Sequence, residues 1–217
     1  MNELKNEIET YVLPYFKKIK INLVHDEVMK TTIKIMNEEL AKETEKDSQE
    51  ISVLLHSIGD FERISDHAIN IMESAEEMHE KKLYFSRKAD EELKIFTEAI
   101  RDIVNTTIQV FEKEDLKLAA MVEPMEEAVD NLNSEIKKRH VKRLRKGKCT
   151  IEMGFVLSDI TTNYERVSDH CSNIALCLLQ LNEENFGTHG FQDSMSVKDN
   201  DAFVAEVNRL REHYQLP

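Results

Sequence analysis

The sequence predicts an all-helical protein. Only five of its 217 residues are glycine and three are proline, so the chain offers few of the turns that a β-sheet requires. Charged residues make up 33% of the chain, and residue types that favour helices, such as Glu, Lys, Leu, Ile and Met, are common. Apolar residues recur every three or four positions over long stretches, which is the period of an amphipathic helix. We therefore expect a bundle of helices.

The first 46 residues carry two helical patterns. Pro14 falls inside the first of them and should bend or end that helix. The positions that form the two patterns are Leu4, Ile8, Val12, Tyr15 and Ile19, followed by Val24, Val28, Thr31, Ile35 and Leu40. Residues 1–46 are thus expected to be helical, although few residues mark where each helix ends.

Two longer helices should follow. Asp47 or Ser48 is expected to cap the first of them, and a break at residues 83–87 should separate it from the second. The apolar stripes of these helices are Leu54, Ile58, Phe61, Ile64, Ala68, Ile71, Ala75 and Met78, and then Leu93, Phe96, Ile100, Ile103, Val104, Thr107 and Phe111.

The rest of the chain predicts two more long helices and a short one. One helix should begin after Asp115, pass through a basic run and end at Gly147, because glycine after Lys and Arg is typical of a helix C-terminus. The last long helix carries the stripe Leu157, Ile160, Tyr164, Val167, Cys171, Ile174, Leu178 and Leu181. Residues 185–198 are expected to form a loop, and Phe203, Val207, Leu210 and Tyr214 indicate a short terminal helix.

One hexamer occurs twice. Glu62-Arg63-Ile64-Ser65-Asp66-His67 returns 103 residues later as Glu165-Arg166-Val167-Ser168-Asp169-His170, and seven of ten positions agree between residues 62–71 and 165–174. Recurrence at a fixed offset predicts an internal repeat. We expect two pseudo-repeated three-helix bundles, over residues 1–82 and 83–184, followed by a loop and a short C-terminal helix in 185–217. Whether the first bundle is complete is left open.

The repeated hexamer places two carboxylates on one helix face. Glu62 and Asp66 are four residues apart and so lie one turn from each other, as do Glu165 and Asp169. This acidic face lies roughly opposite the apolar stripe of the same helix. The carboxylates should therefore project from the outer surface of each bundle.

A second acidic pair is available in the second half. Glu126 and Asp130 lie four residues apart on the helix that precedes Glu165 and Asp169. Carboxylate oxygens are hard ligands, and two pairs on neighbouring helices could hold one or more metal ions. The sequence thus predicts a surface metal site made of four carboxylates.

Other interpretations compete with this one. In a chain with 42 acidic residues, a Glu and an Asp four apart are usually solvated, but the recurrence of the whole hexamer favours metal binding. For His67 and His170, a hydrogen bond to a carbonyl or carboxylate is favoured over ligation. His67 follows Glu62 by five residues, whereas ferritin-like di-iron sites use Glu-x-x-His. That difference argues against oxidase chemistry.

The charge and the cysteines limit the partners and the compartment. A net charge of −13 disfavours broad contact with nucleic acid or an anionic membrane, although local basic clusters can still matter. Basic residues at 137–146 are best explained as a helix end that complements the helix dipole, with a docking patch as the alternative. The three cysteines form no CxxC pair, which fits a reducing compartment. No apolar run is long enough to cross a membrane, so we expect a soluble, cytoplasmic chain.

The two hexamers resemble the PhoU family, whose hallmark is a repeated Glu/Asp-x-x-x-Asp within two three-helix bundles. Residues 52–61 and the tail after Ile174 are similar to the PhoU-like domain at the C-terminus of bacterial sodium/phosphate cotransporters. The resemblance covers roughly residues 47–217. It implies a regulator of inorganic phosphate uptake at the cytoplasmic face of a transporter, with metal clusters, commonly iron or zinc, on each bundle.

The resemblance also assigns ligands by position. In the second half they would be Glu126, Asp130, Glu165 and Asp169. In the first half only Glu62 and Asp66 match, and the second acidic pair has only imperfect candidates, namely Glu3, Glu7, Asp26 and Glu27.

The function expected from the sequence is a non-enzymatic, metal-binding regulator that contacts a phosphate transporter or its sensor protein. The chain could be the soluble domain of such a transporter, and the sequence leaves a homodimer open. One alternative is a metal-free helical adaptor with solvated acidic faces. A second is a carboxylate-bridged metalloenzyme, but the chain has no glycine-rich phosphate loop and no nucleophile elbow.

Overall fold

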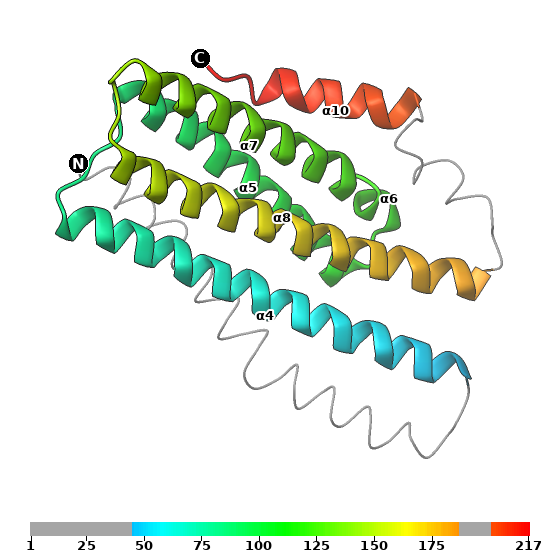
Figure 1. The fold of residues 1–217 in the computed structure, drawn as a ribbon. Coiled ribbons are helices and arrows are strands. Elements are labelled where there is room, and N and C mark those ends of the chain that lie inside the picture. The colour runs from blue at the N-terminus through cyan, green and yellow to red at the C-terminus, as the bar shows by residue number, and fades with distance from the viewer. Residues whose placement is uncertain (1–44, 187–200) are drawn as a thin grey trace.

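A computed structural model of the chain describes residues 45–186 and 201–217 (Figure 1), and within these ranges it contains helices and turns but no strand. The helices are α4 (Glu45–Glu80), α5 (Arg87–Lys113), α6 (Leu116–Ala119), α7 (Val122–Arg145), α8 (Ile151–Phe186) and α10 (Asp201–His213). The prediction of an all-helical fold is confirmed.

Helices α5, α7 and α8 form a bundle, with the short α6 between α5 and α7, while α4 packs along α8 and α10 packs along α7 (Figure 1). The predicted apolar stripes supply the core. Its fully buried members include Phe96 and Ile103 of α5, Ile136 of α7 and Ile174 of α8. The second three-helix bundle is therefore built as the periodicity indicates.

The two helices that carry the repeated hexamer lie against each other. Helices α4 and α8 are both 36 residues long and run antiparallel (Figure 1). Among the described residues, the two halves thus meet mainly through these repeat-related helices. The helices expected in residues 1–44 lie outside the described residues, and the proposed boundaries at residues 82 and 184 stay predictions.

The predicted break at residues 83–87 is present. Helix α5 begins at Arg87, and the Ser86 hydroxyl accepts a hydrogen bond from the Ala89 N–H at 3.4 Å, as an N-cap does. The expected cap at Asp47 or Ser48 is wrong, because both residues lie inside α4. Glu45 and Lys46 are good helix formers, so the helix extends through them.

The prediction of one continuous helix from Asp115 to Gly147 is also wrong. Residues 120–121 separate α6 from α7. Pro124 explains this break, because it has no N–H and its ring would clash with the Ala120 carbonyl in a continuous helix. The interruption starts α7 about one turn before its first candidate ligand.

Gly147 ends α7 in the left-handed conformation, with φ of 62°. Its N–H donates to the Leu144 carbonyl at 2.9 Å, and the Lys148 N–H donates to the Arg143 carbonyl at 3.0 Å, which is the Schellman pattern. The predicted helix end is confirmed.

Alanine at Gly147 is expected to lower the free energy of unfolding by roughly 1 kcal/mol, because an L-residue resists the left-handed conformation. No atom lies within 4 Å of the added Cβ, so the cost is conformational. Gly59→Ala is the matched control: Gly59 lies inside α4, its added Cβ also meets nothing, and alanine there should stabilise by about 1 kcal/mol. Urea unfolding of both variants measures the two changes in the free energy of unfolding. Changes of the same sign and size in the two variants would contradict this explanation.

Across residues 45–186 and 201–217, no helix is both long enough and apolar enough to span a lipid bilayer.

Candidate metal centre

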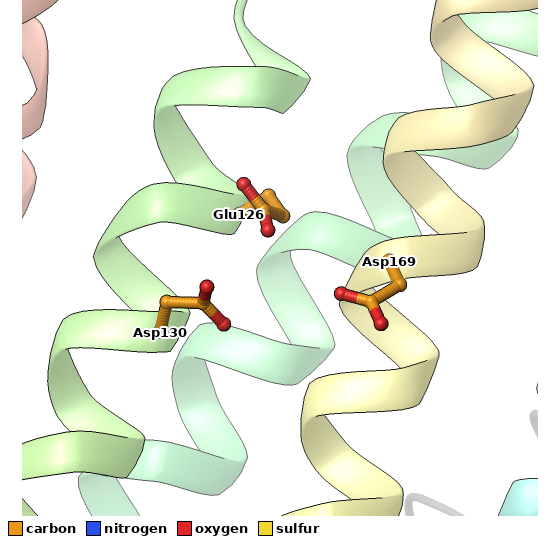
Figure 2. Close-up of side chains that lie close together, drawn as sticks. All are labelled: Glu126, Asp130 and Asp169. Carbon is orange, nitrogen blue, oxygen red and sulfur yellow. The ribbon is translucent and has the colours of Figure 1, made fainter.

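Three carboxylates converge between α7 and α8. Glu126 and Asp130 lie one turn apart on α7, and Asp169 faces them from α8 (Figure 2). One oxygen of each lies within 4.8 Å of the others, and all three side chains are half-buried. We call these residues the carboxylate trio. The structure thus brings together three of the four acids predicted for the second repeat.

The core sets the position of the trio. On α7, Ala128 and Val129 are buried beside Asp130, and on α8, Val167 and Cys171 are buried on either side of Asp169. Burial of these neighbours fixes how each helix is rotated about its own axis. The carboxylates therefore lie at the edge of the α7–α8 contact, partly shielded from solvent and close enough to interact.

Glu165 lies apart from the trio. It is one turn before Asp169, and because α7 and α8 are antiparallel it lies opposite residues that come later in α7. Its Oε2 accepts a hydrogen bond from Asn133 Nδ2 at 2.6 Å and lies 3.5 Å from Lys137 Nζ. The negative charge of Glu165 is therefore already compensated by a cation and an amide.

Arg166 partly offsets the negative charge of the trio. Arg166 Nη1 lies 3.2 Å from Asp169 Oδ2, with the arginine side chain 60% exposed. Exposed ion pairs of this kind contribute little to stability, about 0–1 kcal/mol. Loss of this contact would therefore cost the fold little.

The first repeat presents its acids differently. Glu62 and Asp66 are exposed on α4, and neither belongs to a cluster of three or more potential ligands within the described part of the chain. The candidates for the missing acidic pair, Glu3, Glu7, Asp26 and Glu27, lie outside the described residues. Ligation by Glu62 and Asp66 stays a prediction.

The two histidines of the repeated hexamer connect the halves. His67 Nδ1 lies 2.8 Å from Asn163 Oδ1, and His170 Nδ1 lies 2.8 Å from Asp60 Oδ1. The two rings stack with their centroids 5.6 Å apart. Asp60 and Asn163 are themselves separated by the repeat offset of 103 residues, so each half supplies an equivalent pair. These histidines hold α4 to α8 and stay outside the trio.

Sequence reasoning missed Asp60 and Asn163, although a signal was present. Each precedes the histidine of its own repeat by seven residues, or about two helical turns, and so shares its face. That spacing, repeated in both halves, could have marked them as partners across a contact between the repeats.

The trio suits a hard cation. All of its donors are carboxylate oxygens, without a histidine or a cysteine, and the three lie within 4.8 Å of one another, so their negative charges repel. A bound cation would relieve this repulsion, and water or a further ligand would complete its coordination. The residues present therefore fit a carboxylate-held metal ion.

Fold and site together define an all-helical repeat protein with a carboxylate cluster between two helices of a bundle. The PhoU domain model matches residues 15–75 and 93–178. The chain belongs to the PhoU family, as its repeated hexamer indicated.

One relative is the phosphate-specific transport system accessory protein PhoU homolog 1 of Thermotoga maritima. It is 30% identical over 124 residues, which cover 57% of this chain and 53% of the relative. The chain thus spans about half the length of the curated relative that it matches. No solved structure matches the chain, and the similarity to a cotransporter domain stays a prediction.

Proposed function

We propose that this protein regulates inorganic phosphate transport as a metal-binding accessory protein without an enzymatic activity of its own. Membership of the PhoU family supports the regulatory part, and the relative from Thermotoga maritima is named for a phosphate-specific transport system. The observation that carries the metal-binding part is the carboxylate trio of Glu126, Asp130 and Asp169.

Metal binding would join α7 to α8. Each of the two helices contributes to the trio (Figure 2), so an ion shared between them would fix their relative position at the surface. Iron and zinc are the metals that the family resemblance implies. Zinc in proteins is usually held by cysteine and histidine, so an oxygen-only donor set favours iron of the two.

The partner would be a phosphate transporter or its sensor protein, met at the cytoplasmic face of the membrane. A metal-free helical adaptor is the second candidate, in which the acidic faces are solvated and contact neither an ion nor the partner. The two differ in one respect: only the metal-binding regulator should lose its function when a single carboxylate of the trio becomes an amide.

The test is phosphate uptake in source cells that lack the gene. Restoring the wild-type gene should restore the response of uptake to external phosphate, whereas Asp169→Asn should not. Asp159→Asn is the matched control, because Asp159 is exposed on the same helix and lies outside the trio. Full complementation by Asp169→Asn would refute the metal requirement, and uptake unaffected by the gene would refute the regulatory function.

A further inference from the structure

Two connections meet at one end of the bundle. The α4–α5 and α7–α8 connections lie side by side there (Figure 1), and Lys81 Nζ lies 3.5 Å from Glu152 Oε1 across them. Deeper in the same end, Arg143 Nη1 lies 2.7 Å from Glu92 Oε2 and links α7 to α5. We call residues 81–88 and 141–155 the basic end.

Positive charge is concentrated at the basic end. It holds nine of the 29 Lys and Arg residues of the chain but only one of the 42 Asp and Glu residues, Glu152. The charge of Glu152 is offset in part by Lys81, which lies 3.5 Å from it and also pairs with Glu77 at 2.7 Å. In a chain with a net charge of −13, this end of the described part of the molecule is thus strongly positive.

Most of these cations are available to a partner. Six of them make no ion pair with any described residue, namely Lys82, Lys88, Lys142, Arg145, Lys146 and Lys148. All six are exposed. The sequence favoured the explanation that these basic residues complement a helix dipole. That role needs only the few lysines and arginines in the last turn of α7.

Large apolar side chains are exposed beside these cations. Ile151 is 73% exposed and Phe155 is 68% exposed, one turn apart on the same face of α8. Tyr84 and Val141, 55% and 45% exposed, belong to the same end. Of the six exposed large hydrophobic residues in the described ranges, four therefore lie at the basic end.

We propose that the basic end docks on an anionic lipid surface, with Phe155 and Ile151 entering the interfacial layer. Exposed apolar side chains flanked by lysine and arginine are what peripheral membrane proteins present to such a surface. The remaining, acidic part of the molecule is repelled, so the basic end is turned toward the membrane. The net charge of the sequence disfavours contact with an anionic membrane, but the concentration of positive charge at the basic end permits it. The inference does not depend on the carboxylate trio.

The test is co-sedimentation of the full chain with vesicles. Vesicles of phosphatidylcholine mixed with phosphatidylglycerol should bind the protein at low salt and release it at high salt, whereas phosphatidylcholine alone should not bind it. Replacing Lys82, Lys146 and Lys148 by glutamine should weaken partitioning roughly a hundredfold, at about fivefold for each charge. Ile151→Ser with Phe155→Ser should weaken it by about tenfold or more.

Matched variants elsewhere control for general effects. Lys113→Gln with Lys117→Gln removes exposed charges around the α5–α6 connection, and Val204→Ser removes an exposed apolar side chain of α10. Neither should change partitioning more than twofold. Equal binding to both kinds of vesicle, equal losses in the controls, or no binding to either vesicle, as expected if this end serves an acidic protein instead, would overturn the proposal.

Discussion

Without metal, Asp169→Asn is expected to stabilise the protein against unfolding by roughly 1 kcal/mol. Its carboxylate lies within 4.8 Å of those of Glu126 and Asp130, and two like charges at about 4 Å repel by about 1 kcal/mol in water and more in a partly buried site. The substitution also removes the Arg166 contact, but that arginine is 60% exposed and the contact is worth little.

With metal bound, the wild type should instead be more stable against unfolding than Asp169→Asn. A ligand present at about a hundred times its Kd stabilises the folded state by about 2.7 kcal/mol, and the variant should lose most of this gain. Urea unfolding with a chelator and then with excess metal measures both effects. Asp159→Asn is the matched control, because Asp159 is exposed on the same helix and lies outside the trio. Destabilisation of Asp169→Asn in the chelator, or an equal gain with metal, would contradict the metal assignment.

Breaking the buried ion pair between Glu92 and Arg143 should destabilise the protein by about 3–5 kcal/mol. Glu92 is 3% exposed, and Arg143 Nη1 lies 2.8 Å from its Oε1 and 2.7 Å from its Oε2. Arg143→Met would leave the carboxylate buried with only Arg139, 3.4 Å away. Glu92→Leu would leave the guanidinium of Arg143 without its counterion.

The double variant should behave differently from either single one. Nε and Nη2 of Arg143 are buried without a hydrogen-bond partner in the described part of the chain, so the pair carries a desolvation cost even when intact. Glu92→Leu with Arg143→Met should therefore unfold within about 1 kcal/mol of the wild type. A double-mutant cycle by urea unfolding measures this coupling, and additive losses would show that the pair is not coupled as the geometry indicates.

Periodicity was enough to predict most of the fold. The stripes that contain Ile64 and Val167 were long and regular, and those residues are buried in α4 and α8. Gly147 could be predicted as a helix end because a basic run followed by glycine is a local signal. The break between α6 and α7 has a local cause too, Pro124, but the apolar pattern runs across it.

The site was less predictable because it depends on the register between helices. Spacing along one helix pairs Glu165 with Asp169, and only the packing of α7 on α8 shows that Glu165 faces Asn133 and Lys137 instead. Contacts between the halves, such as His170 with Asp60, require the antiparallel pairing of α4 and α8. No single helix pattern contains that information.

The most direct test of the central claim is to locate the metal in crystals of the iron-loaded protein by anomalous scattering. We predict a peak between α7 and α8, about 2.0–2.6 Å from carboxylate oxygens of Glu126, Asp130 and Asp169, which is lost in Asp169→Asn. Glu165→Gln should leave the peak in place, because Glu165 already pairs with Asn133 and Lys137. The absence of a peak at the trio in metal-replete crystals would contradict the account.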